Sequence, residues 1–229
     1  MTIKIIDITK NPLQRIGEVA STCWNSNAPT SEHKKQIAID CIDSGHHRVL
    51  EYVDMIISIE GYSARMTREL YTAMVGVSKL QESTRYVDCS NFNYYIPESI
   101  KNNEDALVEY NRIMQHIKWG YNSLQKLDIP KQDIANILPL GMMTKVILKI
   151  NLRALLHMAE LRMCNRALKE YRDFMQELKQ VLNKVDDEWD YIISNYYLPK
   201  CEVMGYCNEK NTCGMMPSKG EVLNSYINI

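Results

Sequence analysis

The chain has 229 residues, of which 45% are hydrophobic and 24% are charged, and its formal net charge is −1. This composition is that of an ordinary globular protein, and the length suffices to bury a core without disulfide or metal cross-links. The near-zero charge excludes an overall field that would attract nucleic acid or an acidic membrane, so an anionic ligand has to be met by a local basic cluster.

The N-terminal residues MTIKIIDITK carry charges within their apolar run and no small-residue cleavage site. This pattern predicts a strand and not a signal peptide. No apolar run approaches the ~18 residues that a membrane span needs. The seven cysteines are odd in number and scattered, which favours free thiols in a reducing compartment. We therefore expect a cytoplasmic protein that contacts neither membrane nor nucleic acid.

Along the chain, hydrophobic spacing predicts helices alternating with separated strands. The expected strands are residues 3–8, 52–60 and 144–151. The expected helices are residues 13–24, 33–42, 104–126, 128–134, 152–184 and 188–196. Residues 88–103 are expected to form a loop. The pattern predicts one α+β domain over residues 1–229, with long helices on a small sheet and an irregular, Cys-containing tail from about residue 199.

Three residues mark expected element boundaries. Ser31 is placed to cap the helix 33–42, and Ser63 to cap a further helix that follows the second strand. Gly61 is expected to close that strand. The helix after Ser63 carries Arg65 and Arg68, and Arg65 could form an ordinary ion pair four residues along the helix.

A basic cluster lies in the predicted helix 152–184. Its members are Arg162, Asn165, Arg166, Lys169 and Arg172. At about 100° per residue, they fall within an arc of roughly 120° on one face. Such a face is ordinarily solvated, but acidic residues are scarce around it, and grouped cations suit phosphate oxygens. We expect this face to turn inward or towards a partner.

Two polar segments are further candidates for ligand binding. GHHRVLEY, residues 45–52, places two histidines, an arginine and a glutamate beside a glycine turn, although turn histidines are commonly solvated. QESTRY, residues 81–86, offers an amide, hydroxyls and a guanidinium, which suit a sugar phosphate or the edge of a base.

The tail cysteines Cys201, Cys207 and Cys213 are spaced six apart, and no histidine follows His157 to complete a zinc site. We expect free thiols and no metal. The sequence has no phosphate-binding glycine loop, dinucleotide fingerprint, zinc-protease motif or Ser-His-Asp signature. The residues alone thus predict an α+β domain with an anion-binding face.

Taken in order, the motifs resemble those of the flavin-dependent thymidylate synthase family. They are SGHHRVLEY, a strand ending IEG, then SAR, ESTRYV and GMMTKVILKINLRALLHMAELRMCNRALKEYR. The last segment carries the family's Thr-Lys pair, Asn-x-Arg-x-Leu-Leu and Leu-Arg-x-x-Asn-Arg-Ala-x-x-Glu-x-Arg. The tail PKCEVMGYCNEKNTCG is similar to the family's C-terminus, so the likeness covers about residues 40–215.

The resemblance implies a homotetramer of α+β subunits with active sites at subunit interfaces. It implies bound FAD, with methylenetetrahydrofolate and NADPH as co-substrates, and conversion of dUMP to dTMP without a cysteine nucleophile. Carried over by motif, the nucleotide-binding residues would be Gln81, Glu82, Ser83, Arg85, Lys145 and Arg172. The cofactor-binding residues would be His46, Arg48, Glu51, Asn151, Arg162 and Asn165. No residue is assigned as catalytic, and no metal is implied.

The chain departs from the family at its Arg-His-Arg signature, whose three positions fall on Ala73, Met74 and Val75. Leu140 also replaces an asparagine. Loss of two guanidinium groups removes cations that would stabilise a reduced, anionic flavin. Three alternatives therefore stay open. These are the family reaction, methyl or hydroxymethyl transfer to C5 of another pyrimidine nucleotide, and a non-catalytic nucleotide-binding or partner subunit.

Overall fold

The computed structural model describes residues 1–24, 30–71 and 75–227 of the chain. By their contacts the residues divide into two compact units. Unit 1 comprises residues 1–6, 57–74 and 78–148, and unit 2 comprises residues 7–56, 75–77 and 149–229. Helices combined with one small sheet confirm the predicted α+β class. The single domain over residues 1–229 stays a prediction.

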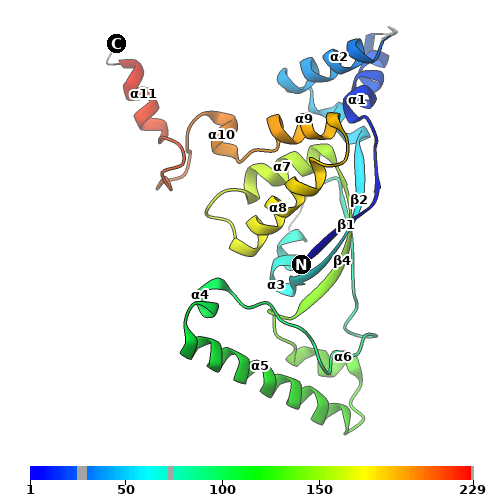
Figure 1. Ribbon diagram of the computed structural model, residues 1–229, viewed down its shortest axis with the longest axis vertical. Helices are drawn as coiled ribbons and strands as arrows, with labels where there is room; N and C mark the ends of the chain where they lie inside the picture. The colour runs from blue at the N-terminus through cyan, green and yellow to red at the C-terminus, as the bar shows by residue number, and fades with distance from the viewer. Residues whose placement is uncertain (25–29, 72–74, 228–229) are drawn as a thin grey trace. The chain divides into compact units, whose positions relative to one another are not determined.

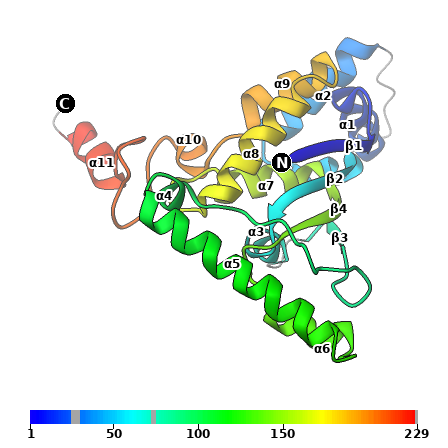
Figure 2. The ribbon, with the colours of Figure 1, turned by 60° about the horizontal axis from the view of Figure 1, so that its bottom comes forward.

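The sheet has four strands in the order β1-β2-β4-β3 (Figure 2). They are β1 (Thr2–Ile8), β2 (Asp54–Ser63), β3 (Val77–Gln81) and β4 (Met143–Asn151). β2 and β4 run antiparallel, since the Ala64 amide donates to Met142 O at 2.8 Å and the Leu152 amide donates to Val53 O at 2.8 Å. Their predicted alternation is confirmed: Met55, Ile57, Ile59, Val146, Leu148 and Ile150 are buried.

Two features of the sheet differ from expectation. β2 does not close at Gly61 but continues to Ser63. Gly61 has φ +84° and lies against β1, where an added Cβ would stand 3.2 Å from Met1 Cα. The glycine therefore serves this close approach and not a strand end. The edge strand β3 was not predicted, because its large apolar residue, Leu80, faces solvent.

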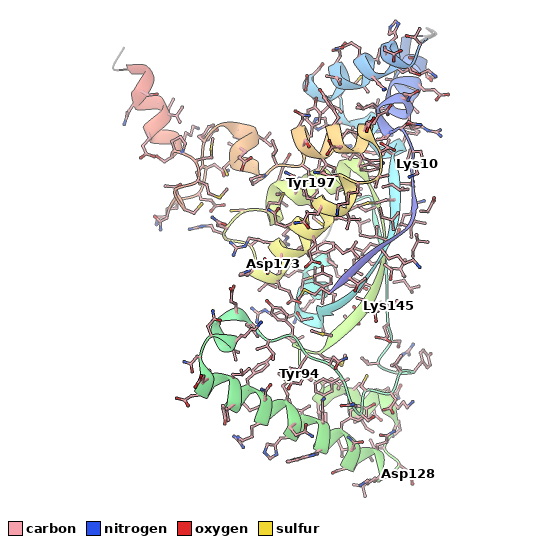
Figure 3. All side chains as sticks on the ribbon, viewed as in Figure 1. Lys10, Tyr94, Asp128, Lys145, Asp173 and Tyr197 are labelled. Carbon is pink, nitrogen blue, oxygen red and sulfur yellow. The ribbon has the colours of Figure 1, made fainter. Side chains whose placement is uncertain are left out.

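The helices of unit 1 are α3 (Ala64–Leu70), α4 (Glu98–Lys101), α5 (Glu104–Gln125) and α6 (Lys131–Ile134). The cap at Ser63 is confirmed, because its Oγ accepts a hydrogen bond from the Met66 amide at 3.1 Å. Figure 1 shows α6 beside α5. Unit 1 also contains a hydrophobic cluster of buried residues, namely Cys89, Phe92, Met114, Tyr121, Ile134 and Met142. Tyr94, labelled in Figure 3, donates to Asn111 Oδ1 of α5 at 2.9 Å.

Unit 2 contains α1 (Pro12–Ser21), α2 (Ser31–Asp43), α7 (Leu152–Arg162), α8 (Lys169–Leu182), α9 (Asp187–Tyr196), α10 (Lys200–Met204) and α11 (Lys219–Ile227). α1 and α2 pack closely, since a Cβ on Gly17 would stand 1.9 Å from Lys34 O. Thr30, and not Ser31, caps α2: its Oγ1 accepts from the His33 amide at 3.2 Å. The tail that was expected to be irregular contains α10 and α11.

The predicted helix 152–184 is wrong, because α7 ends at Arg162 and α8 begins at Lys169. In the loop between them, the Asn165 carbonyl accepts a hydrogen bond from Arg172 Nη1 at 2.6 Å. Leu168, which precedes α8, is extended with φ −51° and ψ 129°. Apolar spacing continues on both sides of this loop, so periodicity alone could not detect the break. The basic residues consequently do not share one helix face.

Candidate functional site

A pocket of about 600 Å³ lies in unit 2, where the ends of α1 and α2 meet the 3₁₀ helix His47–Tyr52 and the start of α7. It is lined by Ala20, Cys23, Cys41, Gly45, His46, His47, Arg48, Val49 and Arg153. One part of the lining is thus apolar or thiol, and the other part is imidazole and guanidinium. This combination suits a ligand with a flat apolar ring and an anionic group.

The end of α2 positions the basic side of this pocket. Gly45 adopts φ +77°, which an L-residue with a side chain rarely adopts. Its amide donates to Ile42 O at 3.0 Å, and the next amide, that of His46, donates to Cys41 O at 2.8 Å. This pair of bonds is a Schellman motif, which ends the helix and reverses the chain. His46 and Arg48 therefore follow shortly after the end of α2, and both line this pocket.

Glu51 and Asn151 both form hydrogen bonds with residues at the start of α7. Glu51 Oε1 lies 2.6 Å from Nη1 of Arg153, which lines the pocket. Asn151 Oδ1 accepts from the Ala154 amide at 2.9 Å and so caps α7. Arg153 was not among the predicted site residues, and His47 was included only as one of the two histidines of the candidate segment GHHRVLEY. The Asn-x-Arg motif could have identified Arg153, whereas nothing in the sequence distinguishes His47 from its neighbour.

Asn151 is also held from outside the helix. Its backbone amide donates a hydrogen bond to Gly76 O at 3.1 Å. Gly76 has φ +88°, and an added Cβ there would stand 2.4 Å from Asn151 Nδ2. The residue at position 76 therefore has to be glycine for this contact to form, and the contact fixes the chain just before β3.

The buried thiol of this pocket, Cys41, is in an environment that disfavours its charged form. Burial raises the pKa of the Cys41 thiol, and the neighbouring Asp40 and Cys23 add to this rise. The charged form of Cys41 is therefore disfavoured, and this part of the lining keeps its apolar character.

The basic cluster from the α7–α8 loop forms a second group in unit 2. Arg172 Nη1 lies 3.1 Å from Asn165 Oδ1 and 2.6 Å from the Asn165 carbonyl. The Arg162 guanidinium stands 5.0 Å above the centre of the Tyr171 ring. The structure thus brings together the cofactor candidates Arg162 and Asn165 and the nucleotide candidate Arg172.

Acidic partners are closer to this cluster than the sequence indicated. Arg166 Nη1 pairs with Glu209 Oε2 at 2.7 Å, and Lys169 Nζ lies 3.0 Å from the Asp173 carboxylate of α8 (Figure 3). The expectation of scarce acids is therefore wrong for these two cations. Their charge is already compensated by these carboxylates, whereas Arg172 donates to the neutral oxygens of Asn165, which makes it the better anion ligand of the three.

The tail contacts the same loop. Asn165 Nδ2 lies 3.2 Å from Met215 Sδ and 3.5 Å from Cys213 Sγ. The pKa of the Cys213 thiol is lowered, first by a hydrogen bond from the Met215 amide and then by the bond from Asn165, with a smaller contribution from Arg166. The thiolate is thus more stable at this position than in an unperturbed cysteine, and Asn165 is linked to the tail as well as to Arg172.

In unit 1, a cavity of about 380 Å³ lies beside the ends of β2, β3 and β4. Its lining includes the nucleotide candidates Glu82 and Lys145 together with Glu60, Asp88 and Thr144. Lys145, labelled in Figure 3, lies 3.8 Å from Glu60. The lining contains three carboxylates and one lysine, so it suits hydroxyl and N–H donors better than a phosphate.

The remaining nucleotide candidates lie on and after β3. Gln81 Nε2 donates to Thr144 Oγ1 at 3.3 Å. Ser83 opens the turn that follows: its carbonyl accepts from the amides of Tyr86 and Val87, both at 3.1 Å. Arg85 is exposed, with its guanidinium 5.2 Å from the Tyr86 ring centre. This guanidinium is open to a ligand from solvent.

The structure places Arg85 in unit 1 and Arg172 in unit 2, so their convergence on one ligand stays a prediction. Of the three positions of the altered signature, Ala73 and Met74 lie outside the described residues. Val75 is in a turn and 98% exposed. Within residues 1–24, 30–71 and 75–227, no group of three His, Cys, Asp or Glu side chains could hold a metal ion. None of the helices in that part of the chain is long and apolar enough to cross a bilayer.

Comparison with known proteins gives consistent matches. A family model described as thymidylate synthase complementing protein matches residues 4–186. The chain is 31% identical to the flavin-dependent thymidylate synthase of Nitratidesulfovibrio vulgaris, over 81% of this chain and 79% of that protein. It is 28% identical to the enzyme of that name from Pyrococcus furiosus, over 91% and 90%. It is 27% identical to the one from Clostridium tetani, over 93% and 92%.

Proposed function

The chain belongs to the family of thymidylate synthase complementing proteins, and we propose that it is a flavin-dependent thymidylate synthase that methylates dUMP to dTMP. In this proposal FAD is the bound cofactor, and methylenetetrahydrofolate and NADPH are the co-substrates. The names of its relatives support the reaction, and the match covers most of each chain.

The observation that carries the proposal is the pocket beside the Schellman turn of α2. FAD combines a flat ring system with an anionic diphosphate, and the pocket lining contains apolar and thiol side chains as well as His46, Arg48 and Arg153. The lining residues fit such a group. We assign His46, Arg48 and Arg153 to its anionic part, with Glu51 orienting Arg153. Bound FAD would supply the two-electron reduction that the reaction requires.

Asn151, Arg162 and Asn165 complete the assigned cofactor residues. Asn151 holds the start of α7, Arg162 is the last residue of that helix, and Asn165 lies in the loop that follows. In this chain their work is binding and orientation, because amide and guanidinium groups donate hydrogen bonds and exchange no proton near neutral pH.

The nucleotide would be held by two sets of residues. We assign the phosphate to Ser83, Arg85 and Arg172, because their hydroxyl and guanidinium groups are phosphate donors. Gln81, Glu82 and Lys145 are assigned to the sugar and base. The charged residues of the lining beside Glu82 and Lys145 are mostly acidic, which suits neutral N–H and hydroxyl donors.

The altered signature favours a second candidate function. Val75 contributes an exposed apolar side chain where the family has a cation, and Ala73 and Met74 are uncharged as well. A chain that has lost these cations could modify C5 of another pyrimidine nucleotide, or bind a nucleotide without catalysis as a partner subunit.

Assembly and location complete the proposal. We infer a homotetramer, as the family resemblance implies. A cytoplasmic location is supported by the seven cysteines, all of which are free.

A flavin titration of the purified full chain tests the proposal. We expect a yellow protein, or a colourless one that takes up FAD with saturable quenching of flavin fluorescence. A chain that remains colourless and shows no saturable binding would contradict flavin-dependent catalysis and favour the non-catalytic partner subunit.

A further inference from the structure

Two neighbouring residues of the edge strand β3, Lys79 and Leu80, lie on unexpected sides. Val77, Lys79 and Gln81 are half-buried, whereas Ser78 and Leu80 are exposed. Leu80 is 72% exposed. The observed register places Val77 inside, but for Lys79 and Leu80 it is the reverse of what the hydrophobic effect favours. The observed register therefore calls for an interaction that involves the inner residues.

The inner side of β3 can be identified from its neighbour. Gln81 donates to Thr144 on β4, and two neighbouring strands can share such a side-chain bond only on one face of a sheet. Thr144 is 5% exposed, and Val146 and Leu148, which follow on the same face, are fully buried. Lys79 therefore projects from the core side of the sheet.

The ammonium group of Lys79 lies 5.0 Å from the centre of the Tyr71 ring. Burial lowers the pKa of Lys79, and it is the sole cause of the shift. Throughout residues 1–24, 30–71 and 75–227, Lys79 has no carboxylate partner. The three residues after Tyr71 are Thr72, Ala73 and Met74, none of which is acidic. An aromatic ring compensates a desolvated cation only in part.

We propose that the Lys79 ammonium group binds a phosphate group, either the monophosphate of dUMP or the diphosphate of FAD. A half-buried cation that has lost water and gained no carboxylate interacts most favourably with an anion, and lysine is a common point-charge ligand for phosphate. β3 leads directly into the turn of Ser83 and Arg85, which carries the assigned phosphate donors. Lys79 is also the first basic residue after Arg68, so it supplies charge next to the segment that lacks it.

This inference rests on the proposed function, which provides two sources of phosphate. The nucleotide carries a monophosphate and FAD carries a diphosphate. Each has a counterpart without phosphate, deoxyuridine for dUMP and riboflavin for FAD. Comparison of each pair separates a contact with phosphate from a contact with base, sugar or ring.

The test uses calorimetric titration of the purified full chain as wild type, K79M, K79R and the control K4M. Lys4 is exposed on β1, so K4M makes the same change of net charge outside the site. We expect K79M to weaken dUMP binding roughly tenfold or more, in line with a lost charge-assisted contact, with deoxyuridine binding unchanged. If the contact is to FAD, the same loss appears for FAD and not for riboflavin. K79R should retain most of the affinity, and K4M all of it.

Thermal unfolding of each variant accompanies the titrations, and K79Q serves as a second neutral variant should K79M not fold. Equal binding of dUMP and of FAD by folded K79M or K79Q and by the wild type would overturn the role of Lys79 while sparing the proposed function. Wild-type protein that binds neither dUMP nor FAD would overturn both.

Discussion

Arg172 joins the first turn of α8 to the loop before it: its Nη1 donates to the Asn165 carbonyl at 2.6 Å and to the Asn165 side-chain oxygen at 3.1 Å. The amide nitrogen of Asn165 in turn reaches the sulfur atoms of Cys213 and Met215. One guanidinium group therefore organises the loop that carries Asn165 and follows Arg162 at the end of α7, and through it a contact with the tail.

Replacement of Arg172 by lysine should loosen this loop. An ammonium group on a different stem cannot reproduce the two bonds of the planar guanidinium. Because the bonds lie near the surface, we expect a loss of about 1 kcal/mol in the free energy of unfolding, which lowers the melting temperature by ~2–4 °C. Circular dichroism melting measures this. R15K, at an exposed position of α1, is the matched control, and an R172K melting curve that coincides with that of R15K would contradict the role of the bonds.

The tail contact predicts a pH-dependent reactivity of Cys213. Its pKa is lowered by the Met215 amide and the Asn165 side chain, and the thiolate is the reactive form. The pH midpoint of iodoacetamide labelling at Cys213 should therefore shift upward in N165A, since one hydrogen bond to the thiolate is lost. Peptide mass spectrometry measures the labelling rate at each pH. Cys23, an exposed thiol outside this contact, is the internal control. An unchanged midpoint at Cys213 would show that Asn165 does not stabilise the thiolate.

The pocket beside the end of α2 predicts an effect on flavin affinity. R48A removes one of the two guanidinium groups in its lining and should weaken FAD binding about tenfold, the loss expected for one charge-assisted contact. Fluorescence titration measures the dissociation constant. R15A removes the same charge from an exposed site on α1 and should leave the constant unchanged. Equal losses in R48A and R15A would indicate a general charge effect and not a contact.

Much of the fold follows from the sequence because the signals are local. β2 and β4 alternate with one buried face, and Ser63 caps α3 as its position before the helix predicts. β3 could not be predicted, since its leucine faces solvent. The break between α7 and α8 was also hidden, because it depends on the bonds between Arg172 and Asn165, and hydrophobic periodicity does not register them.

In the candidate site, too, features encoded by neighbouring residues could be predicted, and contacts between distant residues could not. The turn GHHRVLEY was predicted as a ligand-binding segment, and the structure places His46 and Arg48 in one pocket lining. The pairing of Arg166 with Glu209 joins residues 43 positions apart, so it could not be foreseen from spacing. Lys79 was missed for a physical reason: an isolated lysine in a short polar strand is expected to face water.

Tritium release from C5-labelled dUMP tests the central claim most directly, because methylation at C5 has to displace that hydrogen. The purified chain is incubated with FAD, NADPH and methylenetetrahydrofolate, and labelled dCMP is run alongside. We predict release from dUMP that requires NADPH and methylenetetrahydrofolate, together with FAD that is either added or already bound to the purified chain. Release from dCMP alone would contradict the thymidylate assignment but would support transfer to C5 of another pyrimidine nucleotide. No release from either nucleotide would contradict catalysis by this chain.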